Sequence, residues 1–279
     1  MIKISAVQPI SNCVALGYPF IEAILSIFPI VDEVLINDGG SLDETPFYLK
    51  KLQKIFPKKI KIFNKPYHPS KYWETIDECV EFLISKAKNN WIFEVQGDEI
   101  WHEKNILEIK KIIKNAHKQR FNSIRAVCYY SIGFQKGSPY KYRNVRIVRK
   151  LENLKSHWGG DDFQIGDSIN PAKGFTTSNV PPELKTDIAY FNLSNTAFPK
   201  NTLQRTEIIS TFFAQEDTAR QQHWNKFKIT HLQKHKPDSE AVKQLPAIIQ
   251  GLADFEKYKV RDELFDKKFL RKLTGLNYK

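Results

Sequence analysis

The chain has 279 residues, of which 41% are hydrophobic and 13% are aromatic. This is enough apolar material for one large core, or for one core with a small appendage. No apolar run is long enough to span a bilayer, so a transmembrane segment is not expected. The net charge of +12 favours polyanionic neighbours, such as nucleic acid, an acidic membrane surface or a phosphorylated substrate. A lysine-rich surface also arises from an AT-rich genome without any function.

Neither the first residues nor the cysteines point to secretion. The opening MIKISAVQPISN lacks the long apolar block and the small-residue cleavage site of a signal peptide, and its pattern is that of a strand. The three cysteines, Cys13, Cys79 and Cys128, are far apart and odd in number, which favours neither a disulfide framework nor a metal knuckle. We therefore expect reduced thiols and a cytoplasmic protein, either free or peripheral to a membrane.

Strand and helix patterns alternate over the first third of the chain. We expect strands over 2–8, 34–38, 58–65 and 91–95, separated by helices over 20–28, 45–55 and 72–88. This order predicts an α/β fold, with a mostly parallel sheet flanked by helices. Right-handed crossovers place the carboxyl ends of such strands at one edge, where ligands bind. The loops that follow Gln8, Asp38 and Val95 should therefore lie together.

The remainder of the chain has weaker patterns. We expect a helix over 104–118, two strands over 124–132 and 142–149 with antiparallel or mixed pairing, a long loop-rich segment over 156–182, a short strand over 188–193, and helices over 200–223 and 239–258. Long segments without periodicity are often functional. The simplest division is one α/β domain over 1–198 and a helical C-terminal extension over 199–279 that packs on it.

One stretch, WIFEVQGDEIWHE over 91–103, combines a buried strand with a cluster of acids. A strand that delivers carboxylates at its carboxyl end is how an open α/β sheet presents a metal or a catalytic acid. The same pattern also suits a strand followed by a solvated helix N-terminus, where acids are favoured by the helix dipole. These residues alone do not separate the two interpretations.

A second stretch, DGGSLDET over 38–45, has the form D-x-G-S-x-D-x-T and directly follows a predicted strand. It resembles the first half of the nucleotide-sugar site in family 2 glycosyltransferases of the GT-A fold. The stretch 91–103 resembles the second signature of that family, a strand that ends in D-x-D. It looks most like a subgroup that carries Gln in place of the first Asp. The resemblance covers about residues 1–150, with both motifs in the right order on strand ends.

The resemblance implies a set of residues that bind a nucleotide sugar. Asp38 would contact the base or the ribose, and Gln8 and Pro9 would line the base pocket. Asp43 would support the loop, although capping of a turn explains it equally well. The implied binding residues are Gln8, Pro9, Asp38, Gly40, Ser41, Asp43, Gln96, Gly97 and Asp98.

The resemblance also implies a divalent metal ion, Mn²⁺ or Mg²⁺, at the second motif. A cation held by carboxylates neutralises the charge that develops on a leaving diphosphate. Asp98 is the best candidate ligand, with Glu99 beside it, while Gln96 adds no charge where the family has its first Asp. Related enzymes often supply a late histidine, and the matching strand over 188–193 has none. The candidates to replace it are Asn192, His102, His157 and His231, unless the metal has one ligand fewer.

Transfer with inversion requires a general base that deprotonates the acceptor hydroxyl. The family takes this base from a loop after the D-x-D strand, and the loop WGGDDF offers Asp161 and Asp162 between which the sequence does not choose. Asp167 is a more distant option, and turn formation alone explains such aspartates. Among Arg143, Arg146 and Arg149, one could reach the diphosphate, although a solvated strand face explains arginines equally well.

We therefore expect a metal-assisted, inverting glycosyltransferase that uses a nucleoside diphosphate sugar, with a UDP-sugar favoured. The acceptor is open and includes a cell-surface glycan or hydroxymethylated DNA bases, as in phage-type DNA modification. The charge and the basic tail favour a polyanionic acceptor or an acidic membrane surface. The alternative is a GT-A-like module that binds nucleotide or nucleic acid without catalysis. A nucleotidyltransferase is disfavoured because no Gly-rich nucleotidyl loop with a basic residue lies near the first strand.

Overall fold

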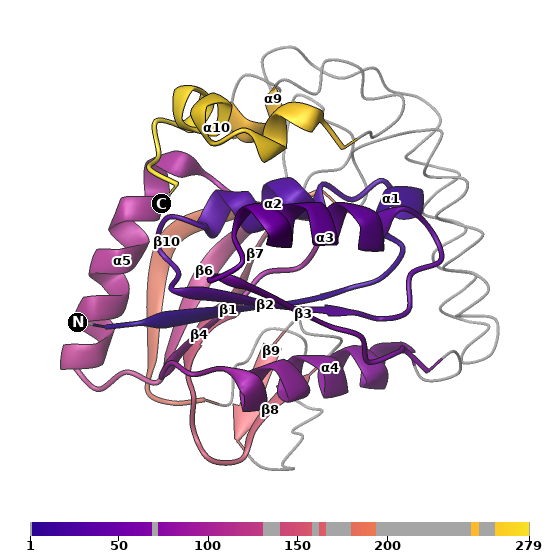
Figure 1. Cartoon of the computed structure of the whole chain (residues 1–279). Helices are drawn as coiled ribbons and strands as arrows, with labels where there is room; N and C mark the ends of the chain where they lie inside the picture. The colour runs from indigo at the N-terminus through magenta and orange to yellow at the C-terminus, as the bar shows by residue number, and fades with distance from the viewer. Residues whose placement is uncertain are drawn as a thin grey trace.

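A computed structural model gives the structure of residues 2–68, 72–130, 140–157, 162–165, 180–193, 247–250 and 260–278. The sheet at its centre has eight strands in the order β3-β2-β1-β4-β7-β6-β10-β5 (Figure 1). The strands are β1 (Ile4–Ile10), β2 (Glu33–Asp38), β3 (Ile60–Phe63), β4 (Trp91–Glu94), β5 (Glu99–Trp101), β6 (Ser123–Tyr130), β7 (Tyr140–Arg149) and β10 (Glu183–Asn192). A separate antiparallel pair consists of β8 (Leu154–His157) and β9 (Asp162–Ile165).

The first four strands form the parallel half of the sheet. β1 pairs in parallel with both β2 and β4, and β2 pairs in parallel with β3. β7 is antiparallel to β4 and β6, β10 is parallel to β6, and β5 is antiparallel to β10. The predicted fold class, a mostly parallel α/β sheet flanked by helices, is confirmed.

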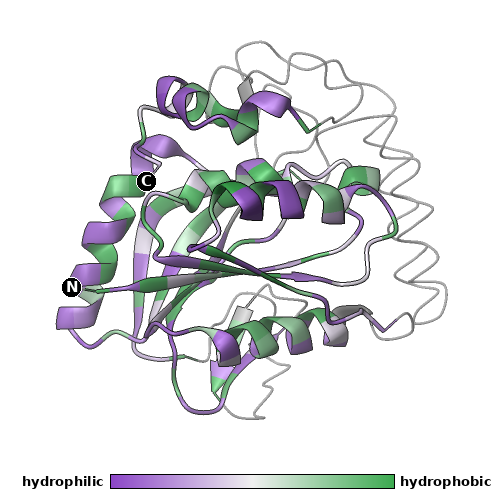
Figure 2. Ribbon diagram, viewed as in Figure 1, coloured by the Kyte–Doolittle hydropathy of each residue, from purple (hydrophilic) through white to green (hydrophobic). Residues whose placement is uncertain are grey.

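Helices cover both faces of the sheet, with α2 and α3 on one side and α4 on the other (Figure 1). The helices are α1 (Cys13–Leu16), α2 (Phe20–Ile27), α3 (Thr45–Ile55), α4 (Tyr72–Lys86), α5 (Glu103–Lys118), α9 (Ala247–Gln250), the 3₁₀ turn η2 (Asp262–Phe265) and α10 (Lys267–Thr274). Green and purple alternate along α4 and α5, as expected for helices with one face on the core (Figure 2).

The core is divided by the sheet because successive side chains of a strand point to opposite faces. In β4, Trp91 and Phe93 belong to the apolar cluster that includes α2 and α5, whereas Ile92 belongs to the cluster that includes α4. In β1, Ala6 and Val7 divide in the same way. Both faces of β1 and β4 are thus buried, which explains why these strands are mostly hydrophobic.

The described parts of the C-terminal segment pack onto this domain. Ile248, Leu264, Leu270 and Tyr278 are buried in the same cluster as α2. Tyr278 stacks on Phe28 with ring centroids 6.2 Å apart. Burial raises the pKa of the Tyr278 hydroxyl to about 12. The expected helix over 200–223 lies outside the described residues, and only four residues of the expected helix over 239–258 lie within them.

Four short elements differ from the expectations. α1 follows β1 directly, β5 follows the acids of the 91–103 stretch, and β8 and β9 lie in or beside the segment expected to be a loop. Each has only three or four residues, which is too short for a hydrophobic period to be recognised. β10 is longer than the expected strand over 188–193. Its first half carries polar residues on a partly exposed surface, so the hydrophobic pattern did not reveal that half.

Candidate functional site

The three loops that were expected to meet do so at the carboxyl edge of the parallel strands. The Gly39 N–H donates to the Ile10 carbonyl at 2.8 Å, which joins the ends of β1 and β2. Gln8 lies in β1 with 1% of its surface exposed, and its Nε2 donates to the Gln96 carbonyl at 3.5 Å. Pro9, also predicted as a binding residue, is buried in β1 opposite Asn37. The prediction of one shared edge is confirmed.

Asp38 organises the loop that follows β2. Its Oδ1 accepts from the Ser41 N–H at 2.9 Å and from the Ser41 hydroxyl at 2.6 Å. The Ser41 Oγ in turn accepts from the Asn12 N–H at 2.7 Å, and the Asn12 Oδ1 accepts from the Leu42 N–H at 2.8 Å. Asp38 is only 5% exposed, so this network fixes the position of its carboxylate at the edge of the sheet.

Asp43 performs both tasks that the sequence suggested for it. Its Oδ1 accepts from the Thr45 N–H at 2.9 Å, which caps the start of α3. Its Oδ2 accepts from the Ala15 N–H at 2.7 Å, and the Thr45 hydroxyl accepts from the Val14 N–H at 3.2 Å. The second half of the motif therefore connects α1 to α3 by hydrogen bonds and stabilises the loop between β2 and α3.

Glycines are required in these loops by close approach and by backbone conformation. A Cβ on Gly39 would lie 2.5 Å from the ring of Tyr67, and Gly40 has a φ of +90°. A Cβ on Gly97 would lie 3.2 Å from the Cys13 Sγ and 3.3 Å from the Ile10 Cγ2. Gly40 and Gly97, both predicted as binding residues, are thus positions that disfavour a side chain, the first through its φ and the second through close packing.

The turn after β4 carries two acids with different surroundings. Asp98 is 6% exposed, and its carbonyl accepts from the Leu193 N–H at 2.8 Å, immediately after β10. Glu99 is fully buried and accepts hydrogen bonds from Arg146. The Arg146 Nη2 lies 2.6 Å from the Glu99 Oε1, and the Arg146 Nε lies 3.0 Å from both carboxylate oxygens of Glu99. Because Arg146 occupies both of its oxygens, Glu99 is placed as an ion-pair partner, and the expectation that it binds the metal beside Asp98 finds no support in its contacts.

The three aspartates of the two motifs converge on Cys13, the first residue of α1. Burial raises the pKa of the Cys13 thiol well above its usual value, and the negative charges of Asp43, Asp98 and Asp38 raise it further. The two motif loops therefore bring negative charge to the same end of the sheet, around the start of α1. Negative charge at this end favours a cation there.

A complete metal site is not formed by protein side chains alone in the described ranges. No three His, Cys, Asp or Glu side chains there gather in a way that could hold a metal ion. Asp98 still suits Mg²⁺ or Mn²⁺, because these ions often take one or two carboxylates and complete their shell with phosphate and water. Of the candidates for a late ligand, His102 caps α5 through the Lys104 N–H, and His231 lies outside the described residues.

The end of β10 does lie at this turn, as the search for a late ligand assumed. Asn192 pairs with Glu99 across β10 and β5, and it is 5% exposed. The end of β10, where a late histidine ligand was sought, is therefore next to Asp98 and carries the amide of Asn192.

Two of the three arginines considered for the diphosphate have partners elsewhere. Arg146 is 0% exposed and lies between Glu99 and Glu94, with its Nη1 3.8 Å from the Glu94 Oε2. Arg143 donates to the Thr186 carbonyl and to Asp187. The expectation of a solvated strand face is wrong for Arg146, because β7 lies in the middle of the sheet.

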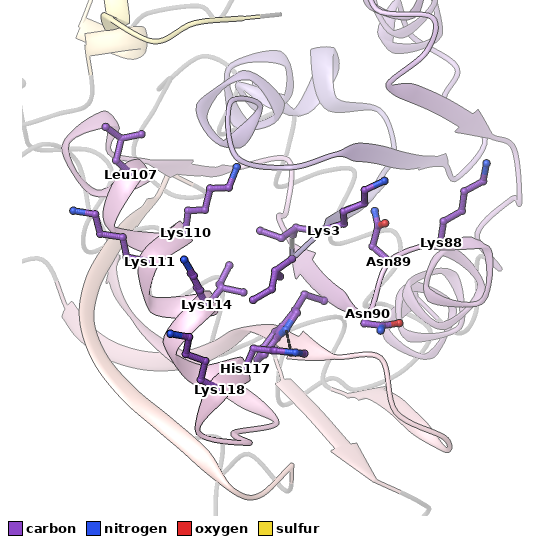
Figure 3. A pocket seen from close by; sticks show the side chains of 14 residues that line it. Lys3, Lys88, Asn89, Asn90, Leu107, Lys110, Lys111, Lys114, His117 and Lys118 are labelled. Atoms are coloured by element: carbon purple, nitrogen blue, oxygen red, sulfur yellow. Dashed lines mark hydrogen bonds between the residues drawn. The ribbon is translucent and has the colours of Figure 1, made fainter.

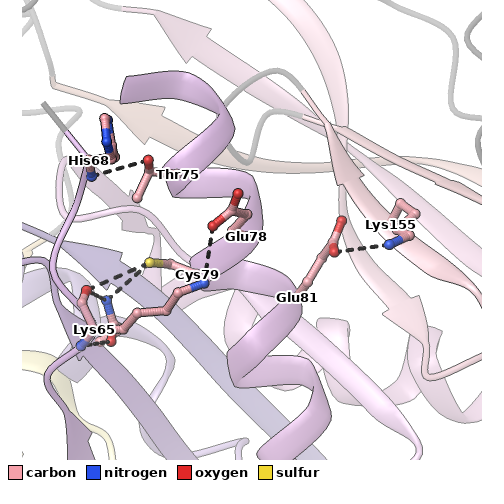
Figure 4. Close-up of polar contacts among 8 residues, drawn as sticks. Lys65, His68, Thr75, Glu78, Cys79, Glu81 and Lys155 are labelled. Carbon is pink, nitrogen blue, oxygen red and sulfur yellow. Dashed lines mark hydrogen bonds and ion pairs between the residues drawn. The ribbon is translucent and has the colours of Figure 1, made fainter. Parts of the chain in front are cut away.

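The β8–β9 pair lies against α4 and leads toward the same edge. Lys155 bridges to Glu81 at 3.3 Å (Figure 4). The next residue, Ser156, donates to Asp77 at 2.8 Å. β8 thus advances toward the start of α4, which follows the carboxyl end of β3. Of the two predicted bases, Asp161 lies outside the described residues, whereas Asp162 begins β9 opposite His157.

Several residues that hold the site together were not expected from the sequence. Asn12 has a left-handed conformation with φ 49°, and its side chain accepts from the motif loop. The Thr45 hydroxyl accepts from α1. The Lys65 N–H, just after β3, donates to Asn37 in β2 and so joins these two strand ends (Figure 4). The only available signal was Asn12 itself, since Asn tolerates this conformation better than most residues do.

No family model matches the chain, and no curated protein matches it. Among solved structures, it is similar to residues 1–349 of S. aureus TarS in complex with UDP, at 14% identity and a TM-score of 0.42, over 90% of this chain and 78% of that one. It is similar to the mannosyltransferase PcManGT from Pyrobaculum calidifontis in complex with GDP-Man and Mn²⁺, at 10% identity and a TM-score of 0.47, over 76% and 63%. It is also similar to a putative glucose-1-phosphate thymidylyltransferase from Bacillus anthracis, at 8% identity and 0.40, over 77% and 96%. Likeness at this level does not identify an activity.

Proposed function

We propose that the protein is a glycosyltransferase that moves a sugar from a nucleoside diphosphate sugar, with a UDP-sugar favoured, to an acceptor hydroxyl. The observation that carries this proposal is that both motif loops meet at the end of β1, where the Gly39 N–H donates to the Ile10 carbonyl and Gly97 packs against Ile10 and Cys13. Ligands of open α/β sheets bind at this edge. The two motifs that resemble family 2 glycosyltransferases are far apart in sequence. Each is bonded to β1 or to the segment that follows it, the first through Asn12 and Ala15 and the second through Gln8.

The residues have separate tasks in this proposal. The fixed carboxylate of Asp38 accepts hydrogen bonds from the ribose or the base, and Gly40 and Gly97 let the backbone approach the donor. Mn²⁺ or Mg²⁺, held by Asp98 and the donor phosphates, would supply neutralisation of the leaving diphosphate. Asp161 or Asp162 takes the proton of the acceptor hydroxyl as its oxygen bonds to the anomeric carbon and the bond to the diphosphate breaks, which inverts the configuration.

A thermal-shift series with nucleoside diphosphates and Mn²⁺ tests donor binding. A ligand that binds only the folded state raises its stability, by about 2.7 kcal/mol at a hundred times its dissociation constant. We expect UDP with Mn²⁺ to raise the melting temperature of the wild type and to do so much less in Asp98→Asn. Asp262→Asn is the matched control, because that carboxylate is 88% exposed and far from the edge. No shift with any nucleoside diphosphate would contradict the proposal.

The alternative is a module that binds nucleotide without catalysis, and it is favoured by the amide of Gln96 and by the engagement of Glu99 with Arg146. Release of UDP from UDP-sugars separates the two functions. Turnover that is present in the wild type and absent in Asp98→Ala supports the enzyme. Donor binding without turnover, across a panel of sugars and hydroxyl acceptors, supports the binding module.

The acceptor class belongs to the same proposal. A polyanionic acceptor, including duplex DNA with hydroxymethylated bases, is motivated by the net charge of +12. Binding to such DNA should weaken steeply with salt, because Lys and Arg release counterions from phosphates. A DNA base would also have to leave the stack to be reached. DNA binding that is absent, or that does not depend on salt, would exclude DNA as the acceptor.

A further inference from the structure

A basic groove lies at the opposite edge of the sheet from the candidate site. It has a volume of about 1010 Å³ and is formed by the amino ends of β1 and β4 and by α5 (Figure 3). β1 runs from this groove at Ile4 to the candidate site at Gln8, and its seven residues span roughly 20 Å. The groove is therefore separate from the nucleotide-sugar site. Six lysines line it: Lys3, Lys88, Lys110, Lys111, Lys114 and Lys118.

These six ammonium groups lack a negative counterpart in the described part of the chain. No Asp or Glu lines the groove, and none of the six side chains forms an ion pair or a hydrogen bond with a described residue. Three acids lie near the groove. Asp32 accepts from the Ile4 N–H, and Glu33 accepts from the Lys88 N–H and is bonded by Lys61 and Ser5. Glu108 is exposed beside Leu107 on α5, so the six lysines leave an excess of positive charge. Like charges so close together repel one another, so an anionic ligand in the groove would be strongly stabilised.

The shape of α5 adds an apolar component. Leu107 is 67% exposed, and Lys110, Lys111 and Lys114 follow it at the spacing that shares one helix face. The opposite face of the helix, with Ile106, Ile109 and Ile113, is buried in the core. A cluster of lysines beside one exposed leucine offers an anionic bilayer electrostatic contacts and a single apolar side chain.

Nucleic acid fits the groove less well. Every cationic side chain that lines it apart from His117 is a lysine, so the bidentate phosphate contacts of arginine are absent from it. The aromatic residue in the lining, Trp91, is 1% exposed and donates through Nε1 to the His117 Nδ1 at 3.3 Å. It offers no open ring on which a base could stack.

We propose that this groove and the exposed face of α5 dock on an anionic bilayer. The lysines bind lipid phosphates, and Leu107 enters the interface. This docking would hold the chain at a membrane surface by the edge opposite to the nucleotide-sugar site, and it does not depend on the proposed transfer reaction.

Co-sedimentation with lipid vesicles tests the proposal. The wild type should bind vesicles of mixed phosphatidylglycerol and phosphatidylcholine, bind pure phosphatidylcholine weakly, and be released by high salt. Neutralising Lys110, Lys111 and Lys114 to Gln should lower the partition coefficient on the order of 100-fold, at roughly fivefold per lysine. Leu107→Asp should lower it further without changing the number of lysines.

A matched variant separates the groove from total charge. Lys50, Lys54 and Lys58 are exposed on or just after α3, and their change to Gln removes the same charge elsewhere. Equal loss in both triple variants, or no loss in the groove variant, would overturn the proposal. So would preferential binding to duplex DNA that the groove variant loses. All variants should keep the wild-type melting temperature and its shift with UDP, so a failure of donor binding would be recognised separately.

Discussion

Arg146 and Glu99 form a fully buried ion pair directly behind the turn that carries Asp98, with Nη2 and Oε1 2.6 Å apart. The Gln96 N–H also donates to the Glu99 Oε2, at 3.3 Å. The pair therefore connects the centre of the sheet to the backbone of the turn. Removal of one partner from a buried pair leaves an uncompensated charge, and this costs about 3–5 kcal/mol.

We therefore expect Arg146→Met to lower the free energy of unfolding by about 3–5 kcal/mol, measured by urea denaturation. Glu99→Gln should also destabilise the protein. The double variant should lose less than the sum of the two because Glu99 is then neutral, and the loss that remains includes that of the Arg146 charge beside Glu94. Additive losses would show that the two residues do not act as a pair. A Glu99→Gln variant that keeps normal stability but loses Mn²⁺-dependent UDP binding would instead indicate that Glu99 is a metal ligand.

The close contact of Gly97 with Cys13 gives a compensating pair of substitutions. Gly97→Ala places a methyl group 3.2 Å from the Sγ, so the turn with Asp98 must move and donor binding should weaken by roughly tenfold, at a stability cost of about 1–3 kcal/mol. Cys13→Ala removes the sulfur and should restore part of both losses in the double variant. Calorimetric titration with UDP and Mn²⁺ measures the binding. A double variant no better than Gly97→Ala would assign the crowding to Ile10 instead.

Asp43 is expected to act mainly through structure. Asp43→Ala removes the acceptor of two backbone N–H groups, those of Ala15 and Thr45, and should cost about 1–3 kcal/mol of stability. Asp262→Ala removes an exposed pair with Lys51 and should change the stability by less than about 1 kcal/mol. Urea denaturation of the two variants makes the comparison. Loss of UDP binding in Asp43→Ala at wild-type stability would instead indicate direct contact with the donor.

Lys59 should give the protein a measurable alkaline dependence. Burial lowers its pKa to about 8, helped by the like charge of Lys110, while Asp32 acts in the opposite direction. An unfolded lysine titrates near 10.4, so the folded state releases this proton first as the pH rises. The cost of the buried charge is complete below about pH 8 and disappears between about pH 8 and 10.4, so this group makes stability rise with pH.

The measurement compares the wild type with Lys59→Met over that pH range. The difference in unfolding free energy between them should change in favour of the wild type as the pH rises, after allowance for the constant loss of the bond from Lys59 to the Phe28 carbonyl. Lys58→Met removes an exposed lysine and should leave the wild-type pH profile unchanged. Parallel curves for wild type and Lys59→Met would contradict the lowered pKa.

Sequence patterns predicted the helices and strands that are long enough to show a hydrophobic period, and the residues whose contacts are close in sequence. The helix expected over 45–55 has those bounds because Pro46 stands in its first turn and Asp43 caps it. The meeting of the loops after Gln8, Asp38 and Val95 followed from strand order alone. The fate of Glu99 could not be predicted, because it depends on a strand nearly fifty residues later that enters the middle of the sheet. Arg146 looks like any surface arginine until that position is known.

The hydrogen bond from Leu193 to Asp98 also bears on the order in which the protein folds. It joins a turn in the first half of the chain to the end of a strand that is synthesised far later, and among the described strands β5 pairs only with β10. Contacts between such distant segments form slowly, because the long intervening loop must close first. The parallel strands β1 to β4 can assemble early from local units, whereas the Asp98 turn acquires its final geometry only once β10 has docked. Newly made chains would thus gain a core before they gain a working site.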